Sequence, residues 1–461
     1  MVSLVRALCI LVLLSSLTLQ AGDNLNLAIS SLRHQVNIIH FATHDELFAS
    51  HLDTLDNEPA IGQLQPIIND VRMFWQSQQI PLRDRSTNFD EPSTDTILSQ
   101  VLGSEPALED YLAVSNRIRY LSFASAQYDW QAISPGGWLK LGDAHRSIPK
   151  LRTRLAHLSD NSVQDLNNVV FDDALEQTVL NFQRRHGLEP DGVVGPATLR
   201  WLNTTAYQRA TIIAEDFVNR SRYLASVGQR YLLINIPAYE MVLVDSDQVV
   251  LNSRVIVGKP YRKTPLLQSQ ISNMVLNPTW RVPRKLLKRD LLPKVGADGS
   301  YISEGKFQVY NRAGDLVVKS DQEWQDLAFG DFPYRLVQQA GESNTLGRYK
   351  FFFENSYNVY LHDTLDTELF ERSDRALSSG CIRVEKIEQL ANWMAANLVK
   401  DKQTWVEMQD DRNTTQWFSL HQTLPVHLVY WTSWVGKQNK LQFRTDIYKR
   451  HQKLSLELAS Q

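Results

Sequence analysis

Only one cysteine, Cys381, remains in this chain once an expected N-terminal export signal, which contains Cys9, is removed. An exported protein with a single thiol cannot close an internal disulfide, so its fold has to be stabilised without one. The 461 residues, 43% of them hydrophobic, are ample for two or three packed domains. The lone thiol is then either a small buried hydrophobe or a nucleophile. Gly380 before it, Arg383 two positions after it and His362 upstream favour the nucleophile.

The first 21 residues are typical of a secretory signal peptide. Arg6 supplies a positive charge, residues 7–19 form a short apolar run, and Ala21 offers a small residue for cleavage. About thirteen apolar positions are too few to span a bilayer, which takes roughly 20, although an uncleaved anchor is the alternative. No later stretch has the length and apolarity of a membrane helix. We therefore expect an exported protein with no stable membrane span after cleavage.

The charge balance argues against one class of partner. The net charge is −3, and no run of basic residues is interleaved with aromatic residues. A nucleic-acid-binding protein needs such a basic surface to neutralise phosphates. We therefore expect no nucleic-acid partner.

The sequence pattern changes along the chain and predicts an α+β protein of several domains. Apolar residues at helical spacing in the N-terminal third predict a helical scaffold without evident chemistry. Farther on, β-branched runs predict a mainly β domain with one amphipathic helix, interrupted at about 283–345 by a charged insertion long enough to be a lid. The expected boundaries are 1–21 for the signal, 22–147 for the scaffold, 148–203 for a compact three-helix module, 204–229 for a helical linker returning to the scaffold, 230–448 for the β domain and 449–461 for a polar tail.

The residues around Cys381 predict an activated thiol. His362 ends an apolar strand, which should fix its ring at a sheet edge. A Ser-Ser-Gly turn is then expected to deliver Cys381 directly before a helix, where unpaired N–H groups favour a thiolate. We therefore predict a lowered pKa for Cys381, helped by His362. The N–H of Gly380 or Cys381 would be available to hold an oxyanion.

Other polar residues near the thiol have two interpretations each. Arg383 is placed either to bind a substrate carboxylate or to form a salt bridge with Glu385, Glu388 or an acidic lid residue. Ser379 and its neighbour fit turn hydroxyls better than a second nucleophile. Asp363 either orients His362 or caps the following loop, and no triad acid is assigned.

The pair formed by His362 and Ser378-Ser379-Gly380-Cys381-Ile382-Arg383 resembles the signature of the L,D-transpeptidase catalytic domain. Residues 182–202 resemble the small three-helix peptidoglycan-binding module of wall enzymes. Together, over about residues 105–448, the chain is similar to the large Gram-negative branch of the family, which has a helical scaffold, an inserted module and a capping loop. One departure is Ser379, where many relatives carry a second histidine. The similarity continues in Asn235-Ile236-Pro237-Ala238-Tyr239, Val257-Gly258-Lys259-Pro260, Thr264-Pro265, Asn277-Pro278-Thr279-Trp280, Asn344-Thr345-Leu346-Gly347, Lys350-Phe351 and Arg444-Thr445-Asp446-Ile447-Tyr448.

The resemblance implies a mechanism. Cys381 would attack the third residue of a tetrapeptide stem at the L-centre of diaminopimelate, with His362 as base. Terminal D-alanine would leave, and an amine of a neighbouring stem would resolve the thioester into a 3→3 cross-link. Arg383 would hold the donor stem, with Ser379 beside it. The aromatic residues Tyr360 and Trp280 are further candidates for this role, and core packing is their alternative.

The resemblance also implies the surroundings of the reaction. It places the protein in a Gram-negative periplasm, acting on peptidoglycan stems as donor and acceptor, with cell-wall synthesis proteins as further candidate partners. No cofactor or metal is required, because thiolate and imidazole suffice, and carbapenems would acylate the same cysteine.

Three other outcomes stay open at this point. The thioester could pass to water, as in an L,D-carboxypeptidase, or to the amine of a wall-anchored lipoprotein. A protein of another class, a non-catalytic wall-binding scaffold with a vestigial thiol, is the third. A generic cysteine protease has no recognisable signature around Cys381.

Overall fold

The computed structural model describes residues 2–84, 93–158, 165–436 and 439–450. The chain forms two compact units. One contains the chain up to Val227 together with Trp431–Thr445, and the other contains Gly228–Tyr430 together with a segment that begins at Asp446. The expected polar tail lies outside the described residues from position 451 onward.

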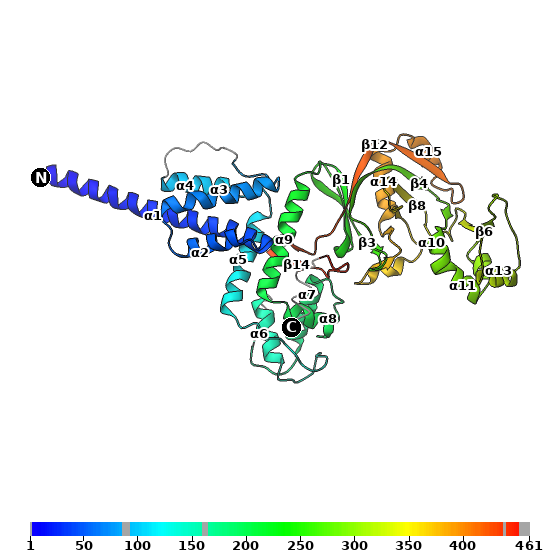
Figure 1. The fold of residues 1–461 in the computed structure, drawn as a ribbon, viewed down its shortest axis with the longest axis horizontal. Helices are drawn as coiled ribbons and strands as arrows, with labels where there is room; N and C mark the ends of the chain where they lie inside the picture. Colours follow the sequence, from blue (N-terminus) through cyan, green and yellow to red (C-terminus); the bar gives the residue numbers. More distant parts are fainter. Residues whose placement is uncertain (1, 85–92, 159–164, 437–438, 451–461) are drawn as a thin grey trace. The chain divides into compact units, whose positions relative to one another are not determined.

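The first unit is a helical bundle with a smaller helical module (Figure 1). Its long first helix, α1, contacts α2, α4, α5 and α9, so the last helix of the bundle packs against the first. Residues at helical spacing, such as Val36, Ile68, Ile118 and Ile213, are buried in one apolar cluster. The bundle helices are α1 (Val2–Thr43), α2 (Glu46–Asp56), α3 (Ile61–Ser77), α4 (Thr94–Gly103), α5 (Tyr111–Gln127) and α9 (Ala206–Leu224), and a short β-hairpin joins β13 (Ser433–Val435) to β14 (Leu441–Phe443).

The module consists of α6 (Ile148–His157), α7 (Asp173–Arg185) and α8 (Pro196–Asn203). Leu175, Val179 and Phe182 lie on one face of α7 and are buried in the module's own core. Gly187 follows α7 with φ of +61°, a conformation that glycine adopts without the steric cost other residues incur. Asp172 caps the start of α7 by accepting a hydrogen bond from Leu175 N–H at 2.9 Å.

The second unit is built on a nine-stranded mixed sheet in the order β10-β3-β11-β9-β8-β4-β12-β1-β2. The last strand in this order, β2, also pairs with the second strand, β3. The helices α14 (Ile387–Asn397) and α15 (Lys402–Glu407) pack into the same core as the sheet. The strands are β1 (Tyr231–Asn235), β2 (Glu240–Asp245), β3 (Gln248–Gly258), β4 (Leu267–Leu276), β8 (Tyr349–Phe353), β9 (Leu361–His362), β10 (Ala376–Ser378), β11 (Ile382–Val384) and β12 (Gln416–Val429).

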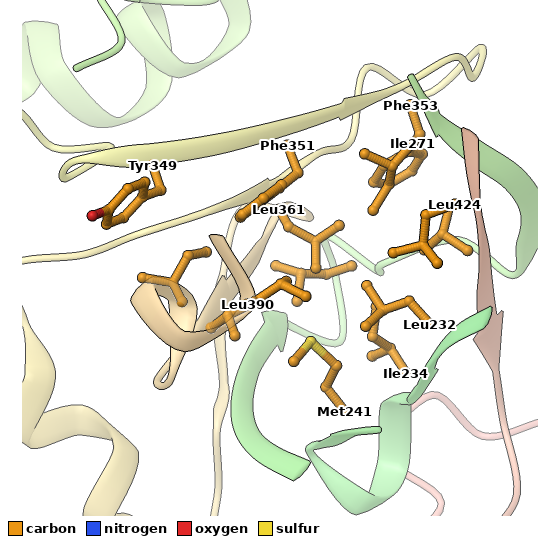
Figure 2. Packing of buried hydrophobic residues seen from close by; sticks show 14 of the residues in the cluster. Leu232, Ile234, Met241, Ile271, Tyr349, Phe351, Phe353, Leu361, Leu390 and Leu424 are labelled. Carbon is orange, nitrogen blue, oxygen red and sulfur yellow. The ribbon is translucent and has the colours of Figure 1, made fainter. Parts of the chain in front are cut away.

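Buried and more exposed side chains alternate along the strands, and the buried ones form the core of this unit. In β8 the side chains of Tyr349, Phe351 and Phe353 are buried, whereas Lys350 and Phe352 point to the other face. Figure 2 shows Phe351 and Leu361 directed toward the same interior as Leu390 of α14. This apolar packing fixes the short strand β9, which carries His362 at its end.

The insertion expected at about 283–345 is a small folded body with its own core. Buried Leu287, Val295, Trp324 and Leu336 form this core, and Trp280 just before the insertion joins it. The segment also contains a three-stranded antiparallel sheet in the order β5-β7-β6, which the sequence analysis missed. Its elements are β5 (Trp280–Arg281), α10 (Arg284–Leu286), a wider helical turn (Leu287–Leu291), α11 (Leu292–Ala297), α12 (Tyr301–Glu304), β6 (Phe307–Tyr310), α13 (Asp321–Ala328) and β7 (Arg335–Gln338).

Within the part of the chain that the structure describes, no helix combines the length and apolarity needed to cross a bilayer.

Replacing Phe351 by alanine should destabilise the second unit by about 3–5 kcal/mol, because a fully buried ring is lost and a cavity remains. Urea unfolding followed by circular dichroism should show a lower midpoint for its transition. Phe352→Ala is the matched control: this side chain is 40% exposed on the same strand, and its loss should cost about 0.5 kcal/mol or less. Equal shifts for the two variants would contradict the assignment of faces.

Candidate active site

The parallel pairing of β9 with β11 brings the predicted nucleophile and base together. Leu361 lies opposite Ile382, and His362 lies opposite Arg383. Because side chains alternate along a strand, Leu361 and Ile382 point into the core, where both are fully buried. His362 and Arg383 therefore face the other side of the sheet, and so does Cys381, two positions before Arg383.

These side chains line one groove of about 830 Å³. Six of the seven predicted site residues are in its wall: Cys381, His362, Arg383, Tyr360, Trp280 and Ser379. Gly380 is buried behind the groove and is not in its wall. The lid supplies the opposite wall, mainly from the helical segment between Pro283 and Lys294.

Two expectations about the local structure are wrong. Cys381 is not followed by a helix: β11 begins at Ile382, and α14 begins only at Ile387. The thiol therefore gains nothing from a helix N-terminus. Strand β9 is not at a sheet edge, because β11 and β8 flank it on either side.

The predicted lowering of the Cys381 pKa is also wrong in direction. Burial raises the pKa of this thiol, although hydrogen bonds from the main chain and the hydroxyl of Tyr360 and the charges of Lys350 and Arg383 partly oppose the effect. The sulfur lies 3.9 Å from the main-chain oxygen of Asn358. At neutral pH the Cys381 side chain is therefore a thiol.

Tyr360 and Trp280 line the groove together with the thiol. Burial, and then the charge of Cys381, raise the pKa of the Tyr360 hydroxyl. The Tyr360 ring also packs against His362, with centroids 5.6 Å apart. Trp280 therefore belongs to the lid core, as the packing interpretation expects, and also lines the groove.

His362 is held as a neutral imidazole. The side chain is buried, and its Nδ1 lies 2.6 Å from the main-chain oxygen of Asp363, which assigns the proton to Nδ1 and leaves Nε2 as an acceptor. Burial, and then the charge of Arg383, lower the pKa of His362 to about 3. The Asp363 carboxylate does not orient the ring. It caps the loop instead, accepting hydrogen bonds from the N–H groups of Arg348 and Thr364.

Arg383 is tied to an acid that the sequence analysis did not name. Its guanidinium contacts Asp366 at 2.7 Å and the hydroxyl of Thr364 at 3.1 Å. Of the expected partners, Glu385 binds Arg254 instead, and Glu388 forms no ion pair with Arg383 in the described part of the chain. The partner of Arg383 is thus set by the turn after β9. Thr364 and Asp366 of this turn come close to Arg383 only in the folded chain.

The sequence analysis did not assign two further residues near the thiol to the site. Arg262 makes a two-pronged ion pair with Asp290 of the lid, at 2.6 and 2.7 Å, and also donates to the Ser379 hydroxyl at 2.8 Å. It thereby connects the lid to the turn that carries Cys381. Lys350 places its ammonium 3.9 Å from the centroid of the Tyr360 ring, and burial lowers its pKa. Its only sequence signal is a lysine in an otherwise aromatic strand.

Gly380 shapes the turn before the thiol. Its φ of +119° is in a region that other residues rarely adopt, and its N–H donates to the Ser378 hydroxyl at 3.0 Å. Its carbonyl accepts from Thr264 at 2.9 Å. Gly380 is thus a conformational residue, and its N–H is already engaged.

No three His, Cys, Asp or Glu side chains in the described ranges gather in a way that could hold a metal ion.

Comparisons with known proteins agree with this geometry. A family model of the L,D-transpeptidase catalytic domain matches residues 229–408, and another, described as "Putative peptidoglycan binding domain", matches residues 145–202. A Haemophilus influenzae protein named "Putative L,D-transpeptidase" is 38% identical over 230 residues, which cover 49% of this chain and 45% of that protein. The match thus spans less than half the length of this relative.

Solved L,D-transpeptidase structures are more distant. The Mycobacterium smegmatis structure has 11% identity and a TM-score of 0.21, covering 44% of this chain and 58% of that chain. The Xylanimonas cellulosilytica structure has 13% identity and a TM-score of 0.20, covering 64% of this chain and 98% of that chain.

The alkylation rate of Cys381 should keep rising with pH beyond about 8.5, the ordinary midpoint for cysteine, because burial disfavours the thiolate. Tyr360→Phe should move the midpoint still higher, since it removes a hydroxyl that stabilises the thiolate. Iodoacetamide labelling followed by mass spectrometry measures both. Tyr357→Phe, an exposed residue of the same groove, is the control that should leave the midpoint unchanged. A midpoint below about 8 in the unmodified protein would overturn this view of the thiol.

Proposed function

We propose that this chain, whose residues 229–408 are an L,D-transpeptidase catalytic domain, is a peptidoglycan L,D-transpeptidase that works through a thioester on Cys381. The observation that carries the proposal is the β9–β11 pairing, which turns Cys381 and His362 to one side of the sheet and into one groove. The activity of the whole protein rests on this site and on the domain match.

The first step is acyl transfer from the donor stem to sulfur. Cys381 Sγ attacks the carbonyl at the L-centre of diaminopimelate while its proton passes to Nε2 of His362. Because the imidazole is neutral at rest, it can accept the proton as the C–S bond forms. The tetrahedral intermediate collapses, His362 returns the proton to the departing amine, and D-alanine leaves.

The oxyanion of this step needs a donor. The Gly380 N–H is bonded to Ser378, whereas the Cys381 N–H has no acceptor among the described residues. We assign the oxyanion to the Cys381 N–H, with Gly380 setting the turn that aims it. The sequence analysis had left the Gly380 and Cys381 N–H groups as alternative donors, and this assignment chooses that of Cys381.

The second step transfers the acyl group to an acceptor amine. The side-chain amine of a neighbouring stem attacks the thioester, its proton passes through His362, and the thiol is regenerated. The product is a 3→3 cross-link. No residue of this chain other than the thiol and the imidazole has to exchange a proton.

The remaining predicted residues have supporting roles in the proposal. Tyr360 positions the thiol through its hydroxyl, and Trp280 holds Tyr360. Arg383 is ion-paired with Asp366, so it supplies positive charge behind His362 and approaches a donor carboxylate only by exchanging that partner. Ser379 lines the groove and accepts from Arg262.

The same proposal assigns the rest of the chain. The module matched at 145–202 would bring the catalytic domain to glycan strands, and residues 1–21 would direct export to the periplasm. The boundaries proposed from the sequence, with the scaffold at 22–147 and the catalytic domain at 230–448, stay proposals.

Incubating the mature protein with disaccharide-tetrapeptide should release D-alanine and yield dimers joined 3→3, detected by mass spectrometry. Cys381→Ala should abolish both products, because no nucleophile remains. Tripeptide without dimers would assign the chain to the L,D-carboxypeptidases, and a product on a lipoprotein amine would assign it to anchoring. A Cys381→Ala variant that still forms dimers would defeat the mechanism.

The acid limb of kcat/KM for D-alanine release should not show the ordinary histidine value of about 6.5. His362 has its pKa lowered to about 3, so the base stays unprotonated and the rate should fall only below about pH 4. A stopped assay over pH 3–8 with buffers of constant ionic strength would measure this. Loss of half the activity near pH 6.5 would contradict a buried neutral imidazole.

A further inference from the structure

The groove beside Cys381 is strongly basic although the chain as a whole carries a net charge of −3. Seven lysine and arginine residues are among its described lining residues, and Asp290 is the single acidic one. Such a local excess of one sign raises the concentration of oppositely charged ligands in a cleft. The composition of the chain does not account for it.

The cations near the thiol already have partners. Arg262 is bound twice to Asp290, and Arg383 is bound to Asp366. Both arginines line the groove. Asp290, the one carboxylate among the described lining residues, is already paired with Arg262. Neither pair accounts for the positive charge on the lid side.

Four cations of the lid line the groove: Arg284 donates to the main-chain oxygen of Tyr334 at 3.1 Å, and the other three are different. Lys285, Arg289 and Lys294 lie along the helical segment that faces the groove, and all three line it. None forms an ion pair with a carboxylate of the described chain, and Lys294 contacts only an aromatic ring, 5.2 Å from the Tyr301 centroid. The segment also contains the wider turn Leu287–Leu291, a helix irregularity that is frequent at functional sites.

Holding three like charges along one wall costs free energy through mutual repulsion unless anions approach them. Lysines without a ligand would be distributed around all faces of a surface helix. Lys288 is such a residue, because it is exposed and does not line the groove. The concentration on one face indicates a ligand that brings carboxylates to the lid side of the groove.

We propose that Lys285, Arg289 and Lys294 select stem peptides whose acidic residues are free carboxylates rather than amides. The inference rests on the proposed function, because the ligand is the donor stem of that reaction. A tetrapeptide stem carries carboxylates at its acidic second residue, on diaminopimelate and at its C-terminus. With the reacting carbonyl at Cys381, the other carboxylates extend along the groove toward the lid.

The test is binding without turnover, using the full mature chain with Cys381→Ala. Titration calorimetry compares a disaccharide-tetrapeptide with free carboxylates and the same compound with its two side carboxyls amidated. The free stem should bind roughly tenfold more tightly, since each exposed ion pair contributes about two- to fivefold. The preference should shrink as salt is raised.

Adding Lys285→Gln, Arg289→Gln and Lys294→Gln together should remove most of the preference, whereas Lys288→Gln on the same segment should leave it intact. Circular dichroism and the thermal midpoint check that each variant is folded. If the triple substitution does not fold, the three single variants serve instead. Equal affinity for the two stems, or a preference that survives the loss of all three charges, would overturn the inference.

The two proposals fail in different ways. With Cys381 intact, release of D-alanine at equal efficiency from free and amidated stems would overturn the lid inference and leave the transpeptidase proposal standing. Preferential binding of the free stem without release of D-alanine from either stem would overturn the catalytic proposal and leave the recognition site in place.

Discussion

The candidate active site depends on one parallel strand pair, β9 with β11. Both strands are very short, two and three residues, so their own hydrogen bonds cannot fix them. Leu361 and Ile382 anchor the pair in the core beneath, next to Phe351 of the adjoining strand. A shift of one residue in this register would turn Cys381 or His362 into the core, so the apolar face sets the chemistry on the polar face.

The sequence was informative where a residue's role follows from its immediate neighbours. The motif around Cys381 and the histidine upstream predicted the pair, and alternating apolar residues predicted the sheet that carries it. The structure of the segment after Cys381 could not be predicted in the same way. Ile382 and Val384 are β-branched and precede an amphipathic stretch, so a short strand and an early helix start compete there.

The electrostatics of the site were harder to predict because they arise from distant segments. Tyr360 and Trp280, together with the packing around them, bury the thiol, and burial outweighs the positive charges that favour a thiolate. Likewise, Glu385, Glu388 and an acidic lid residue were the expected partners of Arg383, whereas the folded chain pairs it with Asp366 in the turn after β9. The lid was recognised as an insertion from its charge, but its small sheet and core rest on pairings between residues far apart.

The raised pKa of Cys381 has a consequence for the survival of a lone cysteine outside the cytoplasm. Peroxide oxidation and mixed-disulfide exchange both consume the thiolate, so a sulfur that stays protonated at rest is a poor target for either. If the protein is exported as proposed and its signal is removed, no second cysteine is present to reverse such damage. A thiol that ionises only when an acyl donor fills the groove would then keep the proposed nucleophile intact in an oxidising compartment.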